Sequence, residues 1–192
     1  MNGTKEAEPI GYVPPWEVND LKECSFYHVM DLPSIGTVGN TWDLRKTIHD
    51  YLGRFDFKGQ RVLDVGSASG YLTFEMERRG ASVVSFDIEA GSEWNCVPYA
   101  SPTFDHKELT ERLEWDIRRI KRAYWFAHRA LQSQAKAFYG NIYDIPAVLG
   151  AFDVVVFGMV LPHLRDPFLA MQSAARLSRG WVIITHPRRS PF

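Results

Sequence analysis

Cysteine, long apolar runs and net charge are all scarce in this sequence. It contains two cysteines in 192 residues, Cys24 and Cys96, which stand far apart and outside any CxxC pair. No Cys/His cluster supplies the three or four ligands of a metal site, so we predict no metal and reduced thiols in a cytoplasmic protein. Lys and Arg number 22 against 23 Asp and Glu. This balance gives no global attraction to nucleic acid or anionic lipid.

No apolar run comes near the roughly 18 residues that cross a bilayer, and we therefore predict a soluble protein with no membrane partner. The N-terminal stretch Met1–Pro9 carries charges with no hydrophobic segment behind them, which is not the pattern of a secretory signal. Hydrophobic residues make up 45% of the sequence and aromatic residues 14%, enough to bury one substantial core.

Residues 1–40 differ in character from the rest of the chain. Glycine, proline and charged residues mix there, which predicts a loose N-terminal arm followed by a single domain over residues 41–192. At the start of that domain, Thr41 is a suitable N-cap for a helix over residues 42–52, and Gly53 is placed to end it.

From about residue 60 onwards, short runs rich in Val, Ile and Phe alternate with helical patterns, as expected for strands buried on both faces. The predicted strands are Arg61–Val65, Ser82–Asp87, Ala135–Tyr139, Phe152–Phe157 and Trp181–Thr185. The predicted helices are Gly70–Arg79, Glu108–Leu131, Ile145–Leu149 and Pro167–Leu177. This alternation predicts an α/β fold: a doubly wound, Rossmann-like parallel sheet of about five strands with helices on both faces. Ligands of such a sheet bind beyond the carboxyl ends of the strands.

The long predicted helix has two different faces. Its apolar residues keep to one stripe, which we expect to pack on the sheet, and Asp105 with Glu108 three residues later predicts a capping box. The other face suits either a phosphate-contacting patch or, as is usual for such a face, a solvated surface. Its basic residues are Arg112, Arg118, Arg119, Lys121, Arg122 and Arg129.

The segment Asp64-Val-Gly-Ser-Ala-Ser-Gly-Tyr71 follows a predicted strand and opens a helix, so its backbone can approach a ligand closely. Tyr71 stands where the dinucleotide fingerprint requires Gly or Ala, which disfavours an NAD-dependent oxidoreductase, and no P-loop ending is present. The acid at Asp64 suits a cationic ligand such as an amino-acid ammonium. Asp87, 23 residues further on, can accept hydrogen bonds from the ribose hydroxyls of an adenosine, or can serve as a helix cap or surface charge.

These features resemble the class I methyltransferases that use S-adenosylmethionine. The resemblance covers residues 59–187, and its main motif reads VLDVGSASGYLTFEMERRGASVVSFDIE. More narrowly, residues 42–51 and the run FGMVLPHLRDPF at 157–168 resemble the branch that contains the tRNA wobble-uridine carboxymethyltransferases. The resemblance implies a methyltransferase-like domain over residues 41–192 with S-adenosylmethionine as its cofactor. The carboxylated form of the cofactor is disfavoured, because no residue set can be assigned to its extra carboxylate.

The resemblance also implies roles for individual residues. The methionine half of the cofactor would be held by Asp64 and the turn after it, namely Gly66, Ser67, Ala68, Ser69 and Gly70. Asp87 would hold the ribose and Ile88 would lie against the adenine. Asn141 would face the adenine amino group and Ile142 its ring, although an Asn in this place also serves simply to form a turn. Gly158 and Met159 would line the floor beneath the sulfonium.

The methyl acceptor is left open by the sequence. Many relatives meet an adenine or amide nitrogen with an Asn/Asp-Pro-Pro-aromatic motif, which is absent because residues 158–161 read GMVL. Oxygen, carbon and other nitrogen acceptors remain. His163 suits either a base that removes an acceptor proton or a structural role before the helix that Asp166 caps. Further substrate candidates at the same rim are Trp94, Tyr99 and His186.

The last predicted strand ends at Thr185, seven residues before Phe192, whereas the sheet of the resembled family usually continues with a helix and two antiparallel strands. We therefore expect a fragment or a shortened member, with an exposed sheet edge that pairs with a second copy, giving a homodimer, or with the N-terminal arm. The expected function is methyl transfer to a small molecule or an RNA base, with tRNA as the RNA partner. The alternative is a non-catalytic S-adenosylmethionine-binding module that acts through association.

Overall fold

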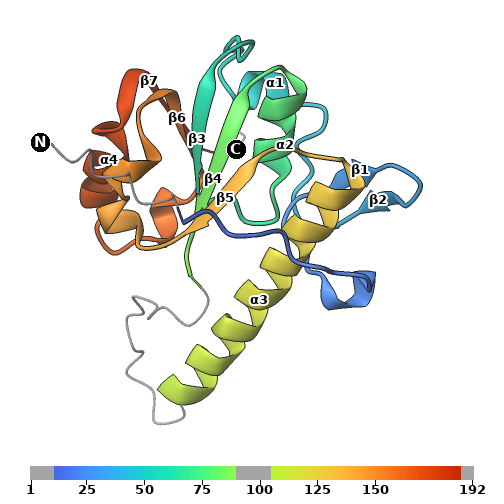
Figure 1. The fold of residues 1–192 in the computed structure, drawn as a ribbon. Coiled ribbons are helices and arrows are strands. Elements are labelled where there is room, and N and C mark those ends of the chain that lie inside the picture. Colours follow the sequence, from blue (N-terminus) through green and yellow to red (C-terminus); the bar gives the residue numbers. More distant parts are fainter. Residues whose placement is uncertain (1–10, 90–104, 187–192) are drawn as a thin grey trace, which may run out of the picture.

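The centre of the molecule is a five-stranded parallel sheet. A computed structural model describes residues 11–89 and 105–186 of the chain (Figure 1). The strands follow the order β5-β4-β3-β6-β7, and every neighbouring pair is parallel. Their bounds are β3 (Arg61–Val65), β4 (Ser82–Asp87), β5 (Lys136–Tyr139), β6 (Phe152–Gly158) and β7 (Ser178–Thr185). The predicted α/β class and the positions of all five strands are thereby confirmed.

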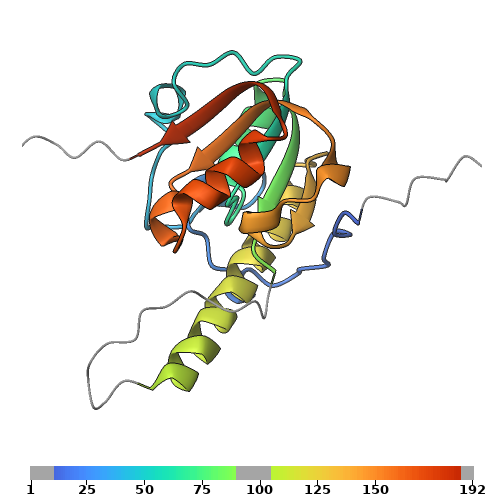
Figure 2. The same cartoon turned by 90° about the vertical axis from the view of Figure 1, so that its left-hand side faces the viewer.

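Helices cover both faces of this sheet because successive strand residues point to opposite sides. On one face, Val62 belongs to a core that includes residues of α2 (Tyr71–Arg78) and α3 (His106–Ala130). On the other, Leu63 belongs to a core that includes residues of α4 (Pro167–Ala175). Figure 2 shows α4 lying across the near face of the sheet, and the first half of α3 extends beyond the sheet in both views.

The predicted caps of the two longer helices are confirmed. The Asp105 carboxylate accepts hydrogen bonds from the backbone N–H groups of Lys107 and Glu108, at 2.8 and 3.1 Å, and so begins α3. Asp166 accepts from the N–H of Leu169 at 2.9 Å and is followed by a proline at the first helical position of α4. Both side chains satisfy donors that have no partner within their helix.

Two predicted helices are wrong in extent or type. The helix expected over residues 42–52 is reduced to the single turn α1 (Ile48–Tyr51), because Asp43 accepts from the backbone N–H of Arg45 and holds the preceding residues in turns. The helix expected over residues 145–149 is a short 3₁₀ turn. The structure contains four such turns, η1 (Leu21–Glu23), η2 (Ile142–Asp144), η3 (Ala147–Leu149) and η4 (Leu161–His163), among its described residues.

Residues 11–40 pack against the body of the domain. Val18 is buried in the core beneath α3, and a two-stranded hairpin of β1 (Met30–Leu32) and β2 (Gly36–Val38) buries Met30 there as well. The division of the chain at residue 40 stays a prediction. What the structure adds is that the segment before it shares the core on the α3 side of the sheet.

The basic face of α3 holds this N-terminal segment in place. Arg119 donates hydrogen bonds to the backbone carbonyls of Lys22 and Cys24, Arg122 forms an ion pair with Glu23, and Arg129 donates to the carbonyl of Val18. Both expectations for this face, a phosphate-contacting patch and a solvated surface, left out this contact with the N-terminal segment, although Arg129 is itself exposed. The expectation of a solvated face is wrong for Lys121, whose side chain is buried.

The two edges of the sheet differ. The N–H of Val13 donates to the carbonyl of Ala137 at 2.8 Å, so the described part of the N-terminal segment, from residue 11 onwards, meets the edge at β5. Pairing of this described part with β7, one of the two expected partners of that edge, is not found. On β7, Trp181 has 63% of its surface exposed, and within the described residues only β6 pairs with this strand. Pairing of β7 with a second copy stays a prediction. No helix in the described ranges is long and apolar enough to cross a membrane.

Candidate active site

The turn between β3 and α2 depends on glycine at both ends. Gly66 has a φ of +80°, and a Cβ there would lie 2.6 Å from the Val160 side chain of the loop after β6. Gly70 has a φ of +88°, and a Cβ there would lie 2.5 Å from the Phe74 ring. Both the left-handed backbone and the crowding exclude larger residues. The turn thus brings its backbone to the carboxyl edge of the sheet, where the strand order reverses between β3 and β6.

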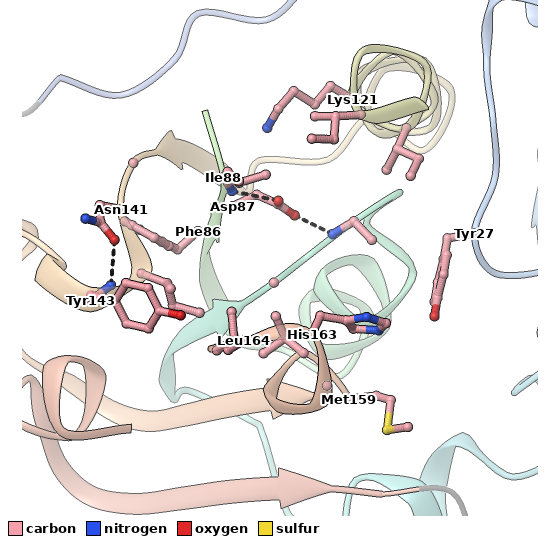
Figure 3. A pocket seen from close by; sticks show the side chains of 18 of the residues that line it. Tyr27, Phe86, Asp87, Ile88, Lys121, Asn141, Tyr143, Met159, His163 and Leu164 are labelled. Carbon is pink, nitrogen blue, oxygen red and sulfur yellow. Dashed lines mark hydrogen bonds between the residues drawn. The ribbon is translucent and has the colours of Figure 1, made fainter. Parts of the chain in front are cut away.

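Asp87 joins this turn to the end of β4. One oxygen of its carboxylate accepts from the N–H of Ala68 at 2.6 Å, and the other accepts from the N–H of Ile88 at 2.7 Å (Figure 3). Ser67 Oγ is a third, longer donor at 3.4 Å. A carboxylate fixed in this way still has free lone pairs, because each oxygen can accept more than one hydrogen bond.

A pocket of about 720 Å³ opens beside Asp87, within the size range of small-molecule sites. Of the predicted site residues, those that line it are Gly66, Ala68, Asp87, Ile88, Asn141, Ile142, Gly158, Met159 and His163. They come from the ends of β3, β4, β5 and β6, as the doubly wound topology requires. The structure therefore brings most of the predicted site to one place.

Asp64 lies beneath this turn and is fully buried. One oxygen accepts from Thr73 Oγ1 at 2.6 Å, while the other has no hydrogen-bond partner among the described residues. Burial raises the pKa of Asp64 to about 7, against the opposing effect of the Thr73 hydrogen bond. The carboxylate is therefore poised to accept one further donor.

The remaining residues of the turn have structural partners. Ser69 Oγ accepts from the backbone N–H of Tyr27 at 3.1 Å, and Gly70 is the N-cap of α2. Asp64, Ser67, Ser69 and Gly70 are not among the residues that line the pocket. Their predicted contact with a cofactor stays a prediction.

The loop after β5 forms another wall of the pocket. Asn141 Oδ1 accepts from the N–H of Tyr143 at 2.9 Å and so begins η2, which is the turn-forming role considered from the sequence. Its contact with an adenine amino group stays a prediction. The Tyr143 hydroxyl accepts from the N–H groups of Arg165 and Asp166, at 3.0 and 3.2 Å, and ties this wall to the loop before α4.

Only one of the candidate catalytic and substrate residues lines the pocket among the described residues. His163 ends η4 on the rim of the pocket and is exposed, near Met159 in Figure 3. His186 follows β7 and does not line the pocket. Trp94 and Tyr99 lie outside the described residues.

Several polar or aromatic residues of the pocket were not expected there from the sequence, among them Tyr27, His28 and Lys121. His28 is buried and stacked between Trp42 and Tyr71, with ring centroids 5.5 and 5.6 Å away, and burial lowers its pKa to about 4. No motif marks Tyr27 or His28. Lys121 was detectable, because it lies four residues after Ile117 and three before Tyr124 and thus beside the apolar stripe of α3.

No three residues of the metal-ligating types come together in the described parts of the chain to hold a metal ion. The polar groups of the pocket are instead suited to hydrogen bonding: a fixed carboxylate at Asp87, an amide at Asn141 and an ammonium at Lys121, set among isoleucine side chains. These groups fit an adenosine. Its ribose hydroxyls need hydrogen-bond acceptors such as the Asp87 carboxylate, and its flat base needs apolar walls.

A parallel sheet with a glycine turn after its central strand and an acid at the end of the neighbouring strand is typical of α/β domains that bind nucleosides. The chain belongs to the methyltransferase domain family, whose model matches residues 42–191. It is thus a domain of the S-adenosylmethionine-dependent methyltransferase class.

Curated relatives carry the name ubiquinone biosynthesis O-methyltransferase. The protein from Paracidovorax citrulli is 26% identical over 166 residues, which cover 78% of this chain and 57% of the relative. The protein from Xanthomonas oryzae is 25% identical over 182 residues, covering 86% of this chain and 64% of the relative. The chain thus spans about three fifths of these relatives' length. They are not tRNA carboxymethyltransferases, so they give no support to the narrower resemblance.

Among solved structures, the N-terminal domain of EvdMO1 with SAH bound is similar in fold. Its TM-score is 0.54 at 20% identity, and the match covers 82% of this chain and 58% of that one. Full EvdMO1 gives a TM-score of 0.51 at 16% identity, covering 81% of this chain and 31% of that one. At these identities the likeness is one of fold.

Proposed function

We propose that this chain binds S-adenosylmethionine in the pocket beside Asp87 and transfers its methyl group to an oxygen of a small molecule. The observation that carries the proposal is the Asp87 carboxylate, held by the Ala68 and Ile88 N–H groups at the mouth of a pocket with isoleucines on its walls. The relatives named as O-methyltransferases support oxygen as the acceptor atom.

Each part of the cofactor has a counterpart among the described residues. Asp87 accepts the ribose hydroxyls, and Ile88 and Ile142 flank the adenine. The unpartnered oxygen of Asp64 suits the ammonium of the methionine half, since a buried carboxylate gains most from a cationic donor. The bound cofactor supplies an electrophilic methyl group.

His163 is the residue best placed to prepare the acceptor. It lies on the pocket rim, and an imidazole can take up a hydroxyl proton near neutral pH. The protein's other contribution is alignment, because methyl transfer requires the acceptor in line behind the methyl group at about 3 Å. Small-molecule hydroxyls are the preferred acceptors, in keeping with the relatives named as O-methyltransferases.

The test offers methyl-labelled S-adenosylmethionine together with small-molecule and tRNA fractions from cell extract. We expect label in the small-molecule fraction, and His163→Ala should reduce turnover about 10²-fold or more while cofactor affinity stays unchanged. His49→Ala, an exposed histidine outside the pocket, is the control. Label in tRNA alone would contradict the small-molecule acceptor, and tight cofactor binding with no transfer would favour the non-catalytic module.

A further inference from the structure

Lys121 is the buried charge that the proposed chemistry leaves unexplained. It sits on α3 with only 2% of its surface exposed, and its ammonium makes no hydrogen bond to the described residues. The ammonium lies over the face of the Tyr139 ring, 3.2 Å from Nζ to the ring centroid. An ammonium has three donors, and leaving them unmet in a buried site costs free energy. A ligand that supplies an acceptor would remove that cost.

Lys121 lies at one end of the pocket. Its side chain reaches from α3 toward Ile88 and Asp87 (Figure 3), above the carboxyl ends of β4 and β5. Gly158 and Met159, the proposed floor beneath the sulfonium, lie at the end of β6, on the far side of β3 from β4. The ammonium therefore faces the adenosine half of the site.

The charges around Lys121 determine which type of ligand atom can accept a hydrogen bond from its ammonium. The groups that act electrostatically on Lys121 are the carboxylates of Asp87 and Glu89, which raise its pKa, and its ammonium lies over the ring of Tyr139. His163, Arg165 and Asp166 are further titratable residues that line the same pocket. Two carboxylates beside one ammonium leave this end of the pocket negative, which opposes a phosphate or carboxylate ligand. A neutral hydroxyl oxygen is compatible with both charges.

We propose that Lys121 donates a hydrogen bond to a ribose hydroxyl oxygen of the bound cofactor, while Asp87 accepts the hydrogen of a ribose hydroxyl. A hydroxyl can donate and accept at once, so the two side chains complement each other across the ribose. Lys121 is thus a specificity residue for the adenosine half. This inference rests on the proposed function, because it requires an adenosine-bearing ligand in this pocket.

Protonation of Lys121 then couples to binding. Burial lowers the pKa of the free ammonium to about 8, with Asp87 and Glu89 acting in the opposite direction. A ligand oxygen that accepts from the ammonium favours its charged form and raises that pKa. Affinity for the adenosine half should therefore fall as pH rises through 8 and beyond.

The experiment is isothermal titration of the full chain with S-adenosylhomocysteine and with 5′-methylthioadenosine, which lacks the amino-acid half and has no group that titrates near pH 8. Lys121→Met keeps the apolar stem and removes the ammonium. We expect it to weaken both ligands by the same factor, about tenfold or more. The control is Lys107→Met on the same helix, whose side chain is 85% exposed.

The pH profile of 5′-methylthioadenosine binding provides a readout that a structural role would not move. The wild-type affinity should fall about tenfold between pH 7 and 9.5, and the Lys121→Met profile should be flat. The wild-type profile needs no variant, so a variant that failed to fold would leave the test intact.

The outcomes separate the two proposals. If the wild-type chain binds neither ligand, the proposed function fails and this inference fails with it. If the wild type binds both ligands with a flat pH profile and Lys121→Met binds them equally well, only the role of Lys121 is overturned. A variant that loses affinity for S-adenosylhomocysteine but not for 5′-methylthioadenosine would place the ammonium at the methionine half and also contradict the inference.

Discussion

Asp64 and His28 are buried titratable residues whose ionisation opposes folding in different pH ranges. The pKa of Asp64 is raised by burial from 3.8 to about 7, so its charged form is penalised in the folded chain. Protonated Asp64 therefore contributes to the free energy of unfolding. This contribution is fully present below about pH 4 and is lost as pH rises through 7. At neutral pH the ligand-free protein therefore carries a destabilising carboxylate that a cationic ligand would neutralise.

Replacing Asp64 with Asn should stabilise the ligand-free protein at pH 8 by about 1–3 kcal/mol, because a buried charge is removed while an acceptor for Thr73 remains. The gain should shrink toward pH 5, as chemical denaturation at several pH values would show. Asp56→Asn, at an exposed turn, is the matched control. Asp64→Asn should also weaken S-adenosylhomocysteine binding, and a stability gain that did not change with pH would contradict the assigned pKa.

His28 makes stability depend on pH in the opposite direction from Asp64. Burial lowers its pKa from 6.5 to about 4, so the unfolded chain takes up a proton at a pH where the folded chain does not. Wild-type stability should therefore fall as pH drops from 6.5 toward 4, by about 3 kcal/mol from this group alone. His28→Phe retains the stacked ring and should remove this part of the acid sensitivity. Equal acid sensitivity of the two proteins in urea titrations would rule out a neutral, buried His28.

At the scale of elements, the turn between β3 and α2 is specified by sterics. Gly66→Ala introduces a Cβ at a φ of +80° and 2.6 Å from the Val160 side chain, so strain and overpacking add together. We expect a loss of about 2–4 kcal/mol and a loss of S-adenosylhomocysteine binding, measured by denaturation and calorimetry.

Gly53→Ala separates those two causes. Gly53 has a φ of +67°, but a Cβ added there would meet no atom within 4 Å, so only the backbone strain of about 1 kcal/mol applies. Equal losses for the two substitutions would mean that the contact with Val160 contributes nothing to the requirement for glycine.

The central strands β3, β4 and β6 were predictable because they are buried on both faces and are rich in Val and Phe. The edge strand β7 is mostly exposed, and it was predictable from its Val and Ile content alone. Local caps were equally readable at Asp105 and Asp166. The helix expected over residues 42–52 was not, since its periodic apolar residues give no sign that Asp43 fixes a turn through the Arg45 N–H.

At the scale of the whole molecule, the predictable part of the site is the part that topology brings together. Gly66, Asp87 and Gly158 lie at the ends of neighbouring strands, so a doubly wound sheet places them in one pocket. Tyr27 and His28 could not be found in this way, because they belong to the segment before the sheet and reach the pocket through tertiary packing, including the hydrogen bond from the Tyr27 N–H to Ser69.

The arginines of α3 show the same limit. Their spacing predicts a common face, but not that residues 18–24 lie across it as acceptors for Arg119, Arg122 and Arg129. Charge patterns in a sequence identify a surface and leave its partner open.

The whole domain should respond to the cofactor as one unit. S-adenosylhomocysteine at a hundred times its Kd should stabilise the folded chain by about 2.7 kcal/mol, which raises the melting temperature by roughly 5–10 °C for a domain of this size. NADH at the same concentration should leave the melting temperature unchanged, and a shift with NADH alone would return the oxidoreductase to consideration.

The most direct measurement is a crystal structure of the chain with S-adenosylhomocysteine. We expect a binding mode with the ribose hydroxyls on the Asp87 carboxylate, the adenine between Ile88 and Ile142, and the amino-acid half along the turn that begins at Gly66. Density for the ligand elsewhere, or a ribose that makes no contact with Asp87, would contradict it.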